Sequence, residues 1–235
     1  MIDFFGLPTP NCWKTSIALE ELGLDYRYTR ISIGDGDQFE AEFDRLSPNN
    51  KIPLIIDHAP LDRGEPQRVF ESDAILLYLA EKTGQLLPRQ GRNRFEVIQW
   101  LFWDASNVGE PHSTRLAFIA EPGSPGSITK KGAEPNTMAA DFLAGKIRDL
   151  YKQLEKQLSG KDYLCGEYSI ADIAVLGHVI PRRVYEVIED LSEFPNTQRW
   201  YQSLRARPAV QRGLALDEEM LATIVDEFRI PFLDQ

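Results

Sequence analysis

Residues 8–14 carry the side chains in this chain that are best suited to chemistry. They read Pro-Thr-Pro-Asn-Cys-Trp-Lys and follow a short apolar run at residues 2–5. This pattern predicts the turn from a first strand into a first helix, where free backbone N–H groups and the positive end of the helix dipole favour an anion such as a thiolate. Thr9, Asn11 and Cys12 offer a hydroxyl, an amide and a thiol within four residues. Which of the three acts depends on what the rest of the chain brings to this turn.

The composition argues against several classes of function. The chain has 235 residues and a formal net charge of −10, so we expect no nucleic-acid partner, because phosphate binding needs basic patches. No apolar run approaches the roughly 20 residues that cross a membrane, and the first residues lack a signal-peptide pattern. Two distant cysteines, Cys12 and Cys165, fit a reducing cytoplasm better than a disulfide framework. The three histidines show no metal-ligand spacing, so we expect no metal.

The first 84 residues predict an α/β unit. Gly23 and Gly84 are natural helix ends, and Ser72 or Asp73 is placed to cap the helix that Gly84 ends. Alternating and continuous apolar runs predict strands, and apolar spacings of three and four predict helices. The elements expected are a helix at 15–22, strands at 26–31, 54–56 and 67–70, and helices at 40–46 and 72–82. The order β-α-β followed by β-β-α is that of a thioredoxin-like domain.

The remainder of the chain predicts an all-helical domain at residues 93–235, after a linker at 85–92. Helices are expected at 93–119, 136–158, 170–183 and 194–207, with a break at 121–135 and a partly helical end after residue 216. The helix start at residues 169–172 is unusually clear. Ser169 is followed three residues later by Asp172, before an apolar run, which is the pattern of a capping box.

Four motifs now occur in order along the chain. They are Thr-Pro-Asn at 9–11, Asn-Lys-Ile-Pro-Leu at 50–54, Phe-Glu-Ser-Asp-Ala-Ile-Leu at 70–76, and Ser-x-x-Asp at 169–172. Together they resemble the cytosolic glutathione transferases over nearly the whole chain. The first two motifs look most like the bacterial nu class, whose relatives include the fungal Ure2-like proteins. The resemblance implies the glutathione transferase fold, with a thioredoxin-like domain followed by an all-α domain.

The resemblance also implies which residues bind glutathione. Pro53 is expected to follow a cis peptide bond, and the backbone of Ile52 then pairs with the cysteine of glutathione as a neighbouring strand would. Glu71 is expected to accept from the α-ammonium group of the γ-glutamyl end. Ser72, with the free N–H groups at its helix start, is expected to hold the carboxylate of that end.

Two further groups of residues follow from the resemblance. Lys51 and Gln38 match positions near the glycine carboxylate of glutathione, although a plain solvated loop explains Gln38 equally well. Trp103, Asn107 and His112 fall in segments that line the electrophile cleft in this family. An aromatic run such as residues 100–103 is, however, also typical of a helical core.

For the turn at residues 8–14, the resemblance implies that Thr9 and Asn11 stabilise the thiolate of glutathione. Lowering the thiol pKa by about 2 takes about 2.7 kcal/mol of preference for the thiolate, which two hydrogen bonds and a helix N-terminus can supply. Cys12 is the alternative. It occupies the second cysteine position of a Cys-Pro-x-Cys turn, where Thr9 occupies the first, and related transferases carry a functional cysteine nearby.

The predicted function is a glutathione transferase-type enzyme that acts as a glutathione-dependent disulfide reductase, with glutathione transfer or thioether cleavage by the same thiolate. Glutathione is the co-substrate, and a small disulfide or electrophile is the second substrate. The alternatives are a non-catalytic glutathione- or partner-binding protein on the same fold, and a thiol transferase that uses Cys12. The resemblance implies a homodimer.

Overall fold

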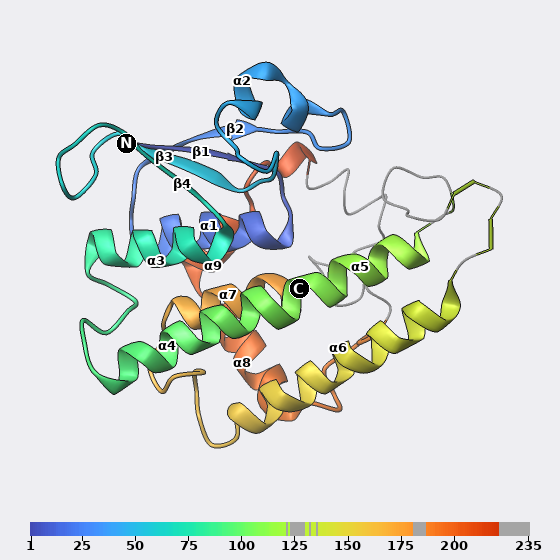
Figure 1. The fold of residues 1–235 in the computed structure, drawn as a ribbon. Coiled ribbons are helices and arrows are strands. Elements are labelled where there is room, and N and C mark those ends of the chain that lie inside the picture. The colour runs from blue at the N-terminus through green and yellow to red at the C-terminus, as the bar shows by residue number, and fades with distance from the viewer. Residues whose placement is uncertain (121, 123–129, 132, 135, 181–186, 221–235) are drawn as a thin grey trace.

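The computed structural model describes residues 1–120, 122, 130–131, 133–134, 136–180 and 187–220 (Figure 1). Its N-terminal part is built on a four-stranded sheet in the order β2-β1-β3-β4. The strands are β1 (Ile2–Gly6), β2 (Tyr26–Arg30), β3 (Leu54–Asp57) and β4 (Gln67–Phe70). β1 pairs parallel with β2 and antiparallel with β3, which in turn pairs antiparallel with β4. This mixed sheet, with its helices, is the thioredoxin-like arrangement that the sequence predicts.

Helices cover both faces of this sheet. α1 (Pro10–Glu21) and α3 (Ser72–Thr83) lie side by side beneath it, and α2 (Ala41–Asp44) lies above it after the short 3₁₀ turn η1 (Asp37–Phe39) (Figure 1). The helix predicted at 15–22 begins earlier, at Pro10. A proline fits the first position of a helix because the N–H that it lacks would have no partner there.

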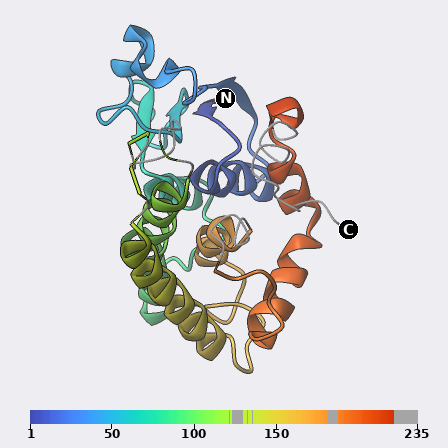
Figure 2. The ribbon, with the colours of Figure 1, turned by 90° about the vertical axis from the view of Figure 1, so that its right-hand side faces the viewer.

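In the second part of the chain, the regular elements that the structure describes are helices, joined by turns and by one isolated β-bridge between Cys165 and Glu167. Its elements are α4 (Arg92–Trp103), the π-helical segment η2 (Asp104–Val108), α5 (Gly109–Ile119), α6 (Thr137–Gln157), α7 (Ile170–Val179), α8 (Pro195–Arg205) and α9 (Pro208–Leu214). Every residue of α7 is buried. Figure 2 shows α7 in the middle, with α1 above it, α4 on one side and α8 and α9 on the other.

Several local predictions can be compared with these elements. The capping box at α7 is confirmed: the Asp172 carboxylate accepts from the Ser169 N–H at 3.0 Å. The predicted cap of α3 is wrong, because Glu71 holds the N-cap position and Ser72 is the first helical residue. Gly84 does end α3, with φ +69°. The helix predicted at 93–119 is helical but contains the π segment η2.

The N-terminal and helical parts approach each other closely along α1. A Cβ atom placed on Gly177 would lie 2.6 Å from the Pro10 carbonyl oxygen, and one on Gly213 would lie 2.6 Å from the Ile17 Cα atom. Glycine is therefore required at both positions for α7 and α9 to reach α1. The contact at Gly177 brings α7 directly against the N-terminal turn of α1.

Some predictions fall outside the described residues. Most of the break at 121–135, the end of the helix at 170–183 and residues 221–235 are among them. The division into residues 1–84 and 93–235 stays a prediction, and α4 begins at Arg92, the last residue of the expected linker. None of the described helices combines the length and apolar character needed to cross a membrane.

Candidate active site

The N-terminus of α1 presents Thr9 and Asn11 at the surface of the sheet domain. Thr9 is the N-cap, with extended backbone and partial burial, and its carbonyl accepts from the Trp13 N–H at 2.9 Å. Asn11 is exposed. Because the first helical N–H groups have no partner within the helix, this end favours an anion, as the sequence predicts.

The thiol of Cys12 points away from this surface into the core. Cys12 is fully buried and is part of the main hydrophobic cluster. Burial raises the pKa of the Cys12 thiol to about 11, although hydrogen bonds from Thr9 and from the Leu7 backbone favour the thiolate. A buried thiol with a raised pKa carries little of the reactive thiolate at neutral pH.

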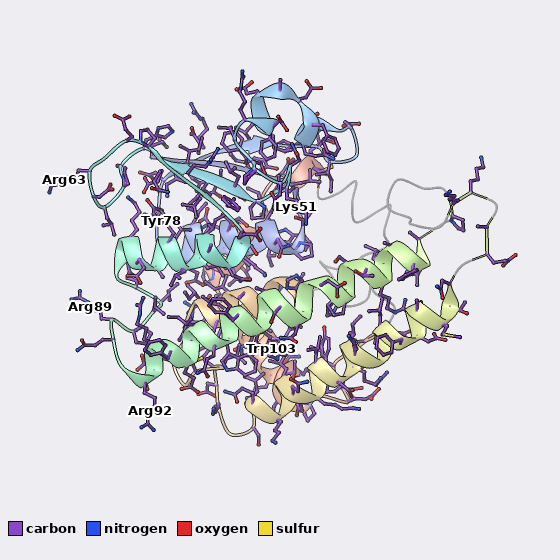
Figure 3. The ribbon with its side chains drawn as sticks, viewed as in Figure 1. Lys51, Arg63, Tyr78, Arg89, Arg92 and Trp103 are labelled. Carbon is purple, nitrogen blue, oxygen red and sulfur yellow. The ribbon has the colours of Figure 1, made fainter. Side chains whose placement is uncertain are left out.

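The loop before β3 has the conformation expected of it. The Ile52–Pro53 peptide bond is cis. The buried Ser47 hydroxyl accepts from the Lys51 N–H and donates to the Lys51 carbonyl, each at 3.0 Å, which holds the loop. Lys51 itself is exposed (Figure 3), and its ammonium group is available to an anionic ligand.

Gln38 lies beside this loop. The Asn50 side-chain amide donates to the Gln38 carbonyl and to the Asp44 carboxylate, both at 2.9 Å. The Gln38 side chain is partly buried, and its amide donates to the Ile33 carbonyl at 3.3 Å. The two residues expected near the glycine carboxylate of glutathione, Lys51 and Gln38, thus come from segments joined through Asn50.

The start of α3 joins the loop to α1. Glu71 is exposed at φ +68°, and its carboxylate accepts from the Asn49 side-chain amide at 3.3 Å. The Ser72 hydroxyl, which is largely buried, donates to the Asn11 side-chain oxygen at 3.3 Å. The residues expected to hold glutathione are therefore connected, segment by segment, from the loop before β3 through α3 to α1.

A buried ionic cluster lies directly behind Ser72, and the sequence analysis did not find it. Lys14 is 1% exposed, and its ammonium group donates to the carboxylates of Asp104 and Asp73 and to the Ser72 hydroxyl. The distances to Asp73 and Ser72 are 3.5 and 3.4 Å. His178 on α7 contacts the other oxygen of Asp104 at 3.2 Å.

The charged groups in this cluster shift one another's pKa values. Burial opposes ionisation of Asp104, but the charges of Lys14 and His178 outweigh it and hold the pKa of Asp104 below its usual value. Burial and the negative charge of Asp104 together raise the pKa of Asp73 to about 7, although the positive charge of Lys14 lowers it. In the sequence, a sign of this cluster is Lys14 itself, a lysine with no acidic residue within four positions on either side of it.

The structure places the three predicted electrophile-site residues in different surroundings. Asn107 is exposed, and its amide donates to the Trp103 carbonyl at 3.1 Å. Trp103 is partly buried and donates to Gln153 at 3.3 Å. His112 is 1% exposed and shares with Trp103 and His178 a cavity of about 10 Å³, room for about one water molecule. The electrophile pocket stays a prediction.

The site as a whole suits a small peptide-like ligand with several charges. Two helix N-termini and Lys51 favour carboxylates, Glu71 can accept from an ammonium group, and the Ile52 backbone can pair with an extended chain. Figure 3 shows Lys51 on the sheet domain and Trp103 in the helical layer below it, with Arg63 and Arg89 at the left-hand edge of the molecule. Among the described residues, no cluster of three or more His, Cys, Asp or Glu side chains could hold a metal.

Comparison with known families gives the same class of protein. Residues 9–82 match the family model described as "Glutathione S-transferase, N-terminal domain", and residues 116–208 match "Glutathione S-transferase, C-terminal domain". The chain belongs to the glutathione S-transferase family.

Two bacterial relatives are similar over most of the chain. The chain is 42% identical to the disulfide-bond oxidoreductase YfcG of Escherichia coli, over 91% of this chain and 94% of that protein. It is 37% identical to the disulfide-bond oxidoreductase YghU of the same organism, over 90% of this chain and 73% of that protein.

Solved structures with bound ligand share the fold. A glutathione transferase family member from Pseudomonas fluorescens, with two glutathiones bound, has a TM-score of 0.81 and 38% identity, covering 91% of this chain and 92% of that one. A glutathione transferase from Pseudomonas putida, with one glutathione disulfide bound per subunit, has a TM-score of 0.82 and 36% identity, covering 92% and 91%.

Proposed function

We propose that this protein is a glutathione-dependent disulfide reductase. The observation that carries the proposal is the exposed N-terminus of α1, where Asn11 is hydrogen-bonded to Ser72 of the γ-glutamyl subsite while Cys12, the thiol nearest to it, is buried. A site of this kind activates a sulfur that arrives with the ligand. The names of YfcG and YghU and the glutathione disulfide in the Pseudomonas putida structure support the same reaction.

In the proposed reaction, the thiolate of one glutathione attacks a sulfur of the substrate disulfide. The S–S bond breaks, a mixed disulfide with glutathione forms, and the leaving thiolate takes up a proton from solvent. A second glutathione thiolate then attacks the glutathione sulfur of the mixed disulfide. Two glutathiones are oxidised to glutathione disulfide, and the substrate is reduced to two thiols.

Each candidate residue has a role in this reaction. Thr9 and Asn11 donate hydrogen bonds to the attacking thiolate at the positive end of α1. Ile52 aligns the cysteine of glutathione through its backbone. Glu71 and the start of α3 at Ser72 hold the γ-glutamyl end. Lys51 and Gln38 hold the glycine carboxylate.

The reaction can be tested with 2-hydroxyethyl disulfide as substrate and glutathione as reductant. Turnover is followed in a coupled assay that reduces the glutathione disulfide as it forms. We expect turnover that requires glutathione and that falls in the Asn11→Ala variant. Retention on glutathione-agarose without turnover of several disulfides would favour the non-catalytic alternative. Failure of both retention and turnover would reject glutathione as the ligand.

The proposal extends to class, assembly and location. The Thr-Pro-Asn and Asn-Lys-Ile-Pro motifs support membership of the nu class. Large apolar side chains are exposed on α4 (Phe95 and Phe102) and on α6 (Met138 and Phe142), and this supports a homodimer. Two unpaired cysteines, Cys12 and Cys165, support a reducing compartment, the cytoplasm.

A further inference from the structure

The ammonium group of Lys14 is fully used inside the protein. An ammonium group has three N–H donors and no acceptor, and Lys14 has three acceptors around it. These are the carboxylates of Asp104 and Asp73 and the Ser72 hydroxyl oxygen. Lys14 is 1% exposed, so it cannot reach a ligand itself. The hydrogen bonds that lead from Lys14 to Asn11 run through Ser72.

Ser72 connects this buried charge to the surface. Its oxygen accepts from Lys14 at 3.4 Å, and its single hydroxyl proton is directed to the Asn11 side-chain oxygen at 3.3 Å. A cation that donates to a hydroxyl oxygen makes that hydroxyl a stronger donor, because successive hydrogen bonds polarise one another. The Asn11 oxygen is the acceptor that benefits.

Because Lys14 donates to Ser72 and Ser72 donates to Asn11, these hydrogen bonds decide which end of the Asn11 amide faces outward. With its oxygen turned inward to Ser72, Asn11 presents its NH₂ group to the exposed side, where a thiolate needs donors. The flipped amide would bring its NH₂ group against the Ser72 hydroxyl, whose oxygen already accepts from Lys14 and whose proton would lose the Asn11 acceptor. It would also turn its oxygen toward the thiolate, where two negatively charged atoms repel each other.

We propose that Lys14 is a positioning residue that, through Ser72, orients the Asn11 amide so that its NH₂ group donates to the sulfur of bound glutathione. The proposal rests on the proposed function, since it takes Asn11 to contact that sulfur. Asp104 holds Lys14 in place from the helical layer, at the π segment η2, and His178 holds Asp104 from α7. The orientation of a side chain in the sheet domain is thus set by groups from both parts of the molecule.

The test measures the pKa of the bound glutathione thiol by the ultraviolet absorbance of its thiolate. The variant is Lys14→Met combined with Asp104→Asn, which removes both charges together and leaves an oxygen for His178. We expect the thiol pKa to rise by about 1, the effect of losing one charge-assisted hydrogen bond. Affinity for S-methylglutathione, which lacks the ionisable thiol, should stay within about twofold.

Two further variants keep the test decisive. Ser72→Ala removes the hydrogen bonds from Lys14 to Ser72 and from Ser72 to Asn11 but leaves the ion pair of Lys14 and Asp104. At saturating glutathione it should raise the thiol pKa by a similar amount. The Lys14 and Asp104 substitutions, added to Ser72→Ala, should then cause no further rise in the thiol pKa. The matched control is Glu21→Gln with Arg207→Met, which removes another ion pair between α1 and the helical layer. It should leave the thiol pKa unchanged.

The outcomes separate this proposal from the proposed function. If Asn11→Ala raises the thiol pKa while Ser72→Ala and the Lys14 variant leave it at the wild-type value, the orienting role of Lys14 is wrong and the thiolate site stands. A fall in S-methylglutathione affinity in the Lys14 variant with no change in thiol pKa also overturns it. If Asn11→Ala leaves the thiol pKa unchanged, Asn11 does not contact the sulfur and the positioning proposal fails. Turnover of 2-hydroxyethyl disulfide with glutathione then decides separately whether the proposed function stands.

Discussion

At the scale of single residues, the contrast between Thr9 and Cys12 supports the proposal that the reacting sulfur belongs to glutathione. The two residues are three positions apart, but Thr9 lies at the helix cap and Cys12 lies in the core. Burial works against a thiolate on Cys12 because the charged form loses its hydration. The sulfur of a bound ligand, by contrast, can accept from the free backbone N–H groups at the start of α1.

We therefore expect Thr9→Ala to damage turnover more than Cys12→Ala. Loss of one hydrogen bond to a charged sulfur should lower kcat/KM for 2-hydroxyethyl disulfide by about 10- to 100-fold. Cys12→Ala should stay within about threefold, with a small loss of stability from the missing sulfur. Steady-state kinetics on both variants is the measurement, and the reverse order would establish Cys12 as the nucleophile.

His112 predicts a pH dependence of stability. Burial, and then the charge of His178, lowers the pKa of His112 from 6.5 to about 4. Between these values the unfolded chain binds the proton and the folded protein does not, so the free energy of unfolding falls as the pH drops from about 6.5 to about 4. Above the upper value the contribution is constant.

Lowering the pH from about 7 to about 4.5 should reduce the free energy of unfolding of both proteins. The reduction in His112→Gln should be smaller than in the wild type by about 2.5 kcal/mol. Glutamine keeps a donor for the Val108 carbonyl, which His112 contacts at 2.6 Å, but it does not titrate. Urea unfolding at the two pH values provides the comparison. Equal losses in the two proteins would show that His112 titrates normally.

At the scale of elements, the start of α7 is held by one carboxylate. Asp172 accepts from the Leu164 N–H at 3.0 Å, from the Ser169 N–H at 3.0 Å and from the Trp200 indole at 2.9 Å. All three partners are donors. The capping box thus also fixes the segment before α7 and the helix α8, which carries Trp200.

Asp172→Asn should destabilise the protein by about 3 kcal/mol, because its NH₂ group meets buried donors in place of an acceptor. Ser169→Ala removes only the hydroxyl part of the cap and should cost about 1 kcal/mol. The free energies of unfolding in urea give both values. If the two substitutions cost the same, the contacts of Asp172 beyond the cap contribute nothing.

At the scale of the whole molecule, α4, α5 and α6 form one flank of the helical layer (Figure 2). α6 packs against α5 and η2 on this flank. Phe102 is 71% exposed on α4, and Phe142 is 64% exposed on α6. Large exposed apolar side chains on neighbouring helices favour association with a second copy.

We expect Phe102→Glu combined with Phe142→Glu to convert a dimer into a monomer, because carboxylates at a buried interface lose hydration without a partner. Sedimentation equilibrium measures the mass, which should fall by half. The control is Leu61→Glu, an equally exposed apolar position in the sheet domain, which should leave the mass unchanged. A wild-type protein that is already monomeric would refute the proposed dimer.

The sequence by itself determined the features that depend on neighbouring residues. The capping box at Ser169 and Asp172 and the end of α3 at Gly84 follow from local chemistry. The cis bond at Pro53 was expected from the family resemblance, and the structure has it. The motifs around Thr9 and Glu71 also indicated the family, since their order and spacing are properties of the chain.

The tertiary structure alone decided which distant charges meet. Lys14 is 59 residues from Asp73 and 90 from Asp104, and no periodicity relates such positions. The same holds for the burial of Cys12, which follows from packing against the sheet, and for the contact of Ser72 with Asn11. A buried charge is stable only where partners converge on it from several elements, so its partners become visible only once the elements are packed.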